Sequence, residues 1–81
     1  MYQIVISKKA KKFIDKLSKN EKSRVVSAIE RLPNGEDIKK LKGVENGYRL
    51  RVGDLRVLFS IEDNDIYIDN IIPRGQAYNR I

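Results

Sequence analysis

The pattern of hydrophobic and polar positions changes its period along this chain, and each period predicts a different secondary structure. Residues 2–7 are rich in β-branched and aromatic side chains, which predicts a strand. Ser7 is then placed to cap a helix with its hydroxyl. The helix is predicted by one apolar stripe at spacings of three and four residues, surrounded by lysines. The stripe consists of Ala10, Phe13, Ile14 and Leu17.

A second helix is predicted to follow directly, because Ser18 and Glu21 have the spacing of a capping box. Residues 33–35, Pro-Asn-Gly, stop this helix, since proline lacks a backbone N–H and glycine accepts the left-handed conformation. The two helices therefore form an antiparallel hairpin. The second apolar stripe consists of Val25, Ala28, Ile29 and Leu32.

The second half of the chain alternates between apolar and polar residues, as half-buried strands do. After a polar connector, Gly53-Asp54 can form a two-residue turn between two strands, and residues 62–65 form a polar turn. Ile66–Ile72 is the last strand, ended by Pro73. Residues 1–81 are therefore expected to form a single α+β domain. Its N-terminal strand, antiparallel helical hairpin and three-stranded antiparallel meander build one mainly antiparallel sheet, with the helices over one face.

The predicted turn fixes the register of the two strands that it joins. A two-residue loop places Val52 opposite Leu55 and Arg51 opposite Arg56, with Arg49 on the same side as Arg51. We call Arg49, Arg51 and Arg56 the arginine face. Like charges directly opposite each other are destabilising, so this face favours a polyanionic ligand that removes the penalty. The alternatives are that acidic side chains of the connector or last strand neutralise the cluster, or that the face is only solvated.

Charge supports a polyanionic partner. The chain has 17 basic and 11 acidic residues, for a net charge of +6. Residues 1–42 hold all ten lysines and carry 12 − 5 = +7, whereas residues 43–81 carry 5 − 6 = −1. Lysines supply a diffuse attractive field, while the planar fork of arginine binds individual phosphates. Nucleic acid is the first hypothesis, and a lysine surface that only maintains solubility is the alternative.

Composition also excludes several classes of chemistry. The chain has no Cys and no His, which excludes disulfides, thiolate or imidazole catalysis and metal sites built on these residues. Lysines interrupt Met1–Ile14, so this segment lacks the apolar region of a signal peptide, and no apolar run is longer than three residues. We expect a cytoplasmic protein without a membrane partner.

Three segments together resemble a known family. They are Lys40-Leu41-Lys42-Gly43, then Gly47-Tyr48-Arg49-Leu50-Arg51-Val52-Gly53-Asp54-Leu55-Arg56-Val57-Leu58-Phe59, then Arg74 with Tyr78. With the chain length and the order of elements, they resemble the RelE/ParE toxin superfamily of bacterial toxin-antitoxin systems over nearly the whole chain. The RelE-like branch contains ribosome-dependent messenger RNA endonucleases, whereas the ParE-like branch inhibits DNA gyrase on the same scaffold and lacks the nuclease residues. Arg74 with Tyr78 favours the RelE-like branch.

The resemblance implies a catalytic set of Arg49, Arg51, Arg56, Arg74 and Tyr78. It implies attack of a ribose 2′-OH on the adjacent phosphate, giving a 2′,3′-cyclic phosphate and a 5′-OH, with no metal and no other cofactor. Arg56 would stabilise charge on the phosphate, Arg74 would act on the leaving 5′-oxygen, and Tyr78 would stack on or orient a base. Arg49 and Arg51 would bind phosphate and lower the pKa of the 2′-OH. The alternative for Tyr78 is an anchor of the tail to the core.

Two departures from the family pattern affect this mechanism. Some members have lysines where this chain has Arg49 and Arg51, and Pro73 replaces a histidine that many relatives have. Arginine stays protonated to about pH 12, so it is a poor general base. We expect no carboxylate on the arginine face, which leaves Tyr78, water or ribosomal RNA as the base. Stabilisation of the transition state is retained, which suggests a slower or more ribosome-dependent enzyme.

The resemblance also names the expected partners: a cognate antitoxin, the ribosome and messenger RNA. Exposed lysines are expected to contact the RNA or the ribosome. They are Lys8, Lys9, Lys12, Lys40 and Lys42. A third possibility is a basic nucleic-acid-binding domain whose arginines only hold phosphates.

Overall fold

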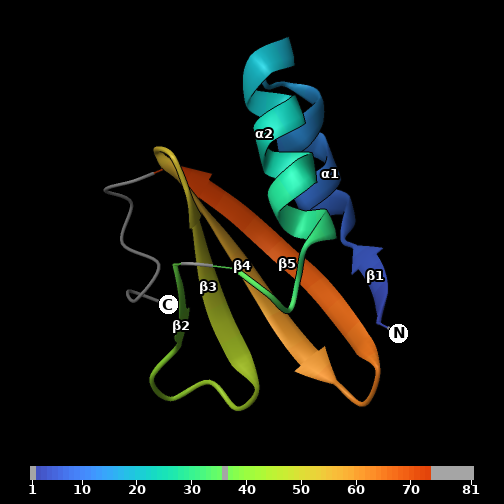
Figure 1. Ribbon diagram of the computed structural model, residues 1–81, viewed down its shortest axis with the longest axis vertical. Coiled ribbons are helices and arrows are strands. Elements are labelled where there is room, and N and C mark those ends of the chain that lie inside the picture. Colours follow the sequence, from blue (N-terminus) through green and yellow to red (C-terminus); the bar gives the residue numbers. More distant parts are fainter. Residues whose placement is uncertain (1, 36, 74–81) are drawn as a thin grey trace.

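The computed structural model describes residues 2–35 and 37–73, and in these ranges two helices lie over one face of a five-stranded sheet (Figure 1). The α+β arrangement is therefore confirmed. Arg74 and Tyr78 lie outside the described residues. In chain order the elements are β1 (Gln3–Ile6), α1 (Lys8–Asp15), α2 (Lys19–Glu30), β2 (Ile38–Lys40), β3 (Gly47–Val52), β4 (Leu55–Glu62) and β5 (Asp65–Pro73).

The sheet brings the two ends of the described chain together. Its strand order is β1-β5-β4-β3-β2, so β1 lies beside β5 although some 60 residues separate them in sequence. This pair is parallel, with Ile4 opposite Ile66 and Ile6 opposite Ile68, while the other three pairs are antiparallel. The sheet is thus mainly antiparallel, as predicted.

The connector contains a strand that the sequence pattern did not predict. Ile38–Lys40 forms β2, which pairs with the outer edge of β3. Three residues are too few for an alternation to be recognised, and the edge of β3 supplies the hydrogen-bonding partners that make the segment extended. The three-stranded meander is therefore completed by a fourth antiparallel strand.

Both helices begin at the predicted caps. Ser7 Oγ accepts a hydrogen bond from the Ala10 N–H at 3.1 Å and donates one to the Asp69 carbonyl at 2.9 Å, which ties the start of α1 to β5. Ser18 Oγ accepts from the Glu21 N–H at 3.3 Å and donates to the Glu21 carboxylate at 3.2 Å. The first cap therefore joins helix to sheet, whereas the second is local to α2.

The core lies between the helices and the inner face of the sheet. Each helix contributes its predicted stripe, although Phe13 and Leu17 are only partly buried. None of the helices in the described ranges is long and apolar enough to cross a membrane. The buried apolar residues are Ala10, Ile14, Val25, Ala28, Ile29, Leu32, Leu50, Val52, Leu55, Val57, Phe59, Ile66, Ile68 and Ile71.

The two caps predict different losses of stability. Ser7→Ala should lower the free energy of unfolding by about 1–2 kcal/mol, because it removes a cap and the bond to Asp69. Ser18→Ala should cost less, about 0.5–1 kcal/mol, because only an exposed local cap is lost. Urea unfolding of both variants measures the difference. An equal or larger loss for Ser18→Ala would show that the contact to β5 contributes nothing.

Candidate functional site

The predicted register of the β3–β4 hairpin is confirmed. Arg51 lies opposite Arg56 and Arg49 opposite Leu58, while Leu50 and Val57 face each other on the core side. The turn is possible because Gly53 adopts φ 57°, a left-handed conformation that suits glycine. The three residues of the arginine face therefore share the side of the sheet that faces away from the helices.

A carboxylate lies on the arginine face, so the expectation that none is present there was wrong. Asp37 Oδ2 lies 3.4 Å from Arg51 Nε, and Asp37 Oδ1 lies 3.7 Å from Arg49 Nη2. The alternative in which an acidic residue of the connector neutralises the cluster therefore holds for these two arginines. The reason is β2: its pairing with β3 carries Asp37 to the side of Arg51, whose N–H donates to the Asp37 carbonyl at 3.1 Å.

Burial differs sharply among these charged groups. The side chain of Arg49 is 7% exposed, whereas those of Arg51 and Asp37 are 45% and 41% exposed. Burying an unpaired charge is costly, so Asp37 makes the burial of Arg49 tolerable. Arg51 is the residue of this ion-paired group that reaches farthest into solvent. Arg56 is partly buried, and the three arginines together with Asp37 carry a formal charge of 3 − 1 = +2.

The lysines divide between the two sides of the sheet. Lys39 pairs with Arg49 across β2 and β3, so it shares the arginine face, although the sequence pattern did not single it out. Lys40 pairs with Tyr48, whose ring stacks on the core residue Phe59 at 5.5 Å, which places Lys40 on the opposite side. If the sequence pattern had predicted β2, the alternation of side chains along that strand would have placed Lys39 on the side of the sheet that carries Arg49.

The other predicted lysines also lie away from the arginine face. Lys8, Lys9 and Lys12 are exposed on α1, in the helical layer, and Lys42 is exposed in the loop before β3. The structure does not gather them with the arginines. Their contacts with RNA or the ribosome stay a prediction.

Acidic residues occupy the far end of the same side of the sheet. Ser60 Oγ donates to Asp69 Oδ2 at 3.2 Å, beside a register irregularity in β4 and β5. Burial raises the pKa of Asp69, and the Ser60 hydroxyl partly opposes this shift. The negative charge of Asp65 raises the pKa of Tyr67, whose hydroxyl donates to that carboxylate at 3.3 Å. In residues 2–35 and 37–73, no three acidic side chains are grouped so as to hold a metal ion.

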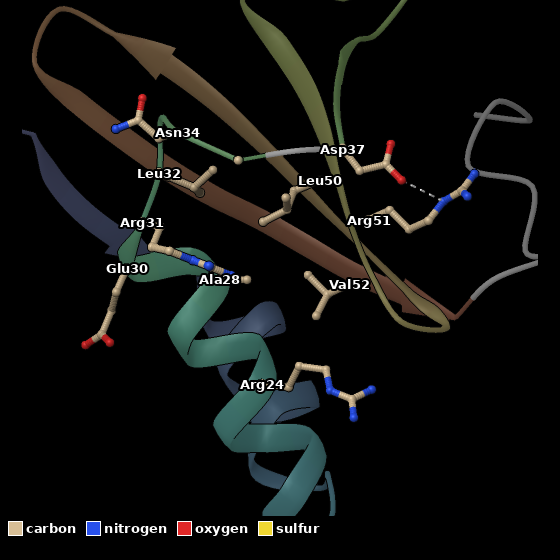
Figure 2. Close-up of a pocket in the computed structure, with 11 residues that line it drawn as sticks. Arg24, Ala28, Glu30, Arg31, Leu32, Asn34, Asp37, Leu50, Arg51 and Val52 are labelled. Atoms are coloured by element: carbon tan, nitrogen blue, oxygen red, sulfur yellow. Dashed lines mark ion pairs between the residues drawn. The ribbon is translucent and has the colours of Figure 1, made fainter.

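A groove of about 1010 Å³ lies between α2 and β3 and reaches Asp37 and Arg51 at one end (Figure 2). We call it the α2–β3 groove. Arg24 and Arg31 of the α2 region line it beside apolar side chains, and the guanidinium of Arg24 lies over the β3–β4 turn, where a Cβ on Gly53 would meet its Nη1 at 3.3 Å. The apolar lining consists of Ala28, Leu32, Leu50 and Val52.

The chain matches a known protein family over most of its length. Residues 4–78 match the family described as the ParE toxin of type II toxin-antitoxin system, parDE. The match covers almost the whole chain. The chain belongs to this toxin family.

Solved structures place the toxin with RelE. It resembles a chain of the archaeal RelE–RelB complex from Pyrococcus horikoshii OT3, with a TM-score of 0.77 and 31% identity over 94% of this chain and 98% of that chain. It also resembles a chain of the RelB–RelE antitoxin-toxin complex from Methanococcus jannaschii, with the same TM-score of 0.77 and 26% identity over 93% of this chain and 95% of that chain. These likenesses support the RelE-like branch.

A curated sequence gives the same indication. The toxin is 37% identical to Toxin RelE3 of Methanocaldococcus jannaschii over 43 residues, which are 53% of this chain and 49% of the relative. The matched segment thus spans about half the length of that protein.

The raised pKa of Asp69 makes stability depend on pH. Because the folded-state pKa lies above the unfolded one, ionising Asp69 costs stability as the pH rises through the folded pKa, and the cost is absent below the unfolded pKa. Asp69→Asn cannot ionise, so its melting temperature should gain on the parent between about pH 3 and pH 7.

Ser60→Ala should lower the melting temperature relative to the parent as the pH rises, because it removes the hydroxyl that lowers the pKa of Asp69. Scanning calorimetry across this pH range compares the three proteins. A constant difference between Asp69→Asn and the parent would contradict the pKa shift.

Proposed function

We propose that this toxin is a ribosome-dependent, metal-independent messenger RNA endoribonuclease that inhibits translation and is held inactive by an antitoxin. The observation that carries the proposal is the register of β3 and β4, which gathers Arg49, Arg51 and Arg56 on one side of the sheet. Asp37 neutralises part of the positive charge of Arg49 and Arg51, but Arg51 still lies directly opposite Arg56, where like charges disfavour each other. A phosphate bound between them turns that repulsion into attraction.

The chemistry that suits this face is cleavage by the ribose of the RNA itself. Attack of the 2′-OH on the adjacent phosphorus concentrates negative charge on the phosphoryl oxygens, which fixed guanidinium groups stabilise. Arg56 would hold this charge and Arg51, the more exposed residue, would receive the phosphate. The products would be a 2′,3′-cyclic phosphate and a 5′-OH.

Arg74 and Tyr78 complete the proposed site through the family resemblance. Arg74 would stabilise the leaving 5′-oxygen and Tyr78 would stack on or orient the base. We assign the general base to Tyr78, water or ribosomal RNA rather than to Asp37, because each oxygen of Asp37 faces a guanidinium group.

The substrate is proposed to approach under two kinds of attraction. Exposed lysines of α1, such as Lys8, Lys9 and Lys12, would supply a field that draws the toxin to ribosomal RNA. The arginine face, on the other side of the sheet, would bind individual phosphates in a defined orientation. Since ribosomes and messenger RNA are the proposed targets, the toxin would act in the cytoplasm.

Inhibition of DNA gyrase is the second candidate function. The observation that favours it is the matched family itself, which is described by ParE. In that case the toxin would be a binding module without chemistry. Measuring protein synthesis beside gyrase supercoiling separates the two functions.

Arg56→Ala tests the proposed chemistry. Losing one preorganised donor to the transition state should slow single-turnover cleavage on saturated, programmed ribosomes by about 10²–10³-fold. Ribosome affinity should change little, because the additional negative charge on the phosphoryl oxygens, which Arg56 is proposed to stabilise, develops only in the transition state. Arg74→Ala is expected to behave in the same way.

Lys12→Ala is the matched control, because it also removes one positive charge but from the helical layer. It should weaken association and its salt dependence while leaving the rate in the bound state unchanged. If Arg56→Ala and Arg74→Ala cleave as fast as the parent, or if the parent blocks gyrase and leaves messenger RNA intact, the nuclease proposal is wrong.

An antitoxin is proposed to cover Arg51, which lies on the arginine face and also lines the α2–β3 groove. An amphipathic segment with acidic residues would match the apolar lining and the basic side chains around it. Arg51→Glu should therefore weaken the co-purifying antitoxin at least tenfold, a loss of about 1.4 kcal/mol. The parental affinity should fall with salt.

Lys12→Glu makes the same change of charge on α1 and should leave antitoxin affinity close to that of the parent. Calorimetric titration of each variant with purified antitoxin gives the comparison. Equal affinities for Arg51→Glu and the parent would place the antitoxin elsewhere, with the helical hairpin as the next surface to test.

A further inference from the structure

We propose that Asp37 is a positioning residue of the arginine face: its carboxylate bridges Arg49 and Arg51 and holds the Arg51 guanidinium group in the orientation that receives a phosphate. This inference rests on the proposed nuclease function. Neither the alternation of apolar and polar residues nor the family resemblance indicated a role for Asp37. The bridge exists because β2 pairs with β3.

The backbone fixes where the Asp37 carboxylate lies. The Arg51 N–H donates to the Asp37 carbonyl at 3.1 Å, one residue beyond the paired residues Ile38 and Leu50. Asp37 is thus directly across from Arg51 and diagonal to Arg49. Across antiparallel strands, long side chains can reach both the direct and the diagonal neighbour. One short carboxylate can therefore engage two arginines.

The bridge leaves a phosphate-binding end on the exposed arginine. Asp37 Oδ2 approaches Arg51 at Nε, 3.4 Å away, and the two terminal nitrogens extend beyond this contact (Figure 2). A guanidinium has five N–H donors in a planar fork, so one edge can be oriented by a protein carboxylate while the other binds phosphate. Arg49 is almost entirely buried, and Asp37 Oδ1 lies 3.7 Å from its Nη2.

The same carboxylate has two opposed effects on a substrate. It restrains the arginines against their mutual repulsion, which favours the chemical step because a small displacement of a positioned group is costly. It also cancels one of the positive charges on this side of the sheet, which disfavours an incoming phosphate. Removing the charge should therefore tighten binding and slow cleavage. If Asp37 only maintained the fold, its removal would lower both the affinity for the substrate and the cleavage rate.

Asp37→Asn tests this split, because it keeps the size of the side chain and removes its charge. Its single-turnover rate on saturated, programmed ribosomes should fall about tenfold. Its affinity for a 2′-O-methyl RNA oligonucleotide, which cannot be cleaved by its own ribose, should rise about threefold at low salt, and this gain should shrink as salt increases. Asp37→Glu, which restores the charge, should recover most of the rate.

Asp15→Asn is the matched control. It makes the same change in net charge at the exposed end of α1, away from the arginine face. It should leave the cleavage rate and the oligonucleotide affinity within about twofold of the parent, as is usual for a surface charge. A gain in affinity equal to that of Asp37→Asn would mean that only net charge matters, and the proposal would fail.

A third readout does not depend on cleavage. In ¹H–¹⁵N spectra of the free protein, the Nε–H resonance of Arg51 should shift and broaden in Asp37→Asn and stay in place in Asp15→Asn. If the parent fails to cleave messenger RNA, the nuclease function is wrong, and the spectra with the oligonucleotide affinity still decide the role of Asp37. Unchanged Arg51 resonances, or a parallel loss of rate, affinity and melting temperature, would overturn the proposal.

Discussion

The register of the β3–β4 hairpin is the constraint on which the rest of this structure depends. A two-residue turn at Gly53-Asp54 places Leu50 against Val57 in the core and Arg51 against Arg56 outside. A slip by one residue would exchange the two faces, burying the arginines and exposing the apolar residues. The hydrophobic core therefore enforces the arginine pair, and the cost of that repulsion is offset by burial on the other face. This coupling lets a small domain keep an unfavourable cluster of charges in a fixed geometry.

The short strand β2 adds the second condition. It covers part of the edge of β3 and delivers a single carboxylate to the two arginines of that strand. A buried arginine without a partner would be costly, and Asp37, 3.7 Å from Arg49, offsets part of that cost while Arg51 reaches solvent. The charge that remains on the face is smaller than the count of its arginines suggests. Stability and the proposed anion binding therefore depend on the same three side chains.

The two sides of the sheet carry different kinds of basic side chain. The helical layer carries exposed lysines, whose field acts at a distance and falls with salt, while the opposite side carries arginines fixed by the backbone. The matching family is described by ParE, whereas the two solved complexes with a similar fold contain RelE, so one scaffold serves toxins with both names. Fold alone does not select between a nuclease and an inhibitor; the arrangement of side chains on the arginine face is what favours the nuclease.

The sequence by itself determined the elements whose signals are local. Two apolar stripes and the caps at Ser7 and Ser18 predicted the helices, and a glycine turn with period-two alternation predicted the hairpin and the opposed arginines. Which segments pair at the edges of the sheet was decided only by the tertiary structure. The three-residue strand β2 is too short for an alternation of apolar and polar residues to be seen. The position of Asp37 follows from the pairing of β2 with β3, and β1 lies beside β5 in parallel. Both pairings join segments that are separated in the sequence. Such contacts are selected by the free energy of the whole sheet, because a strand edge is satisfied by whichever segment the packed core brings to it.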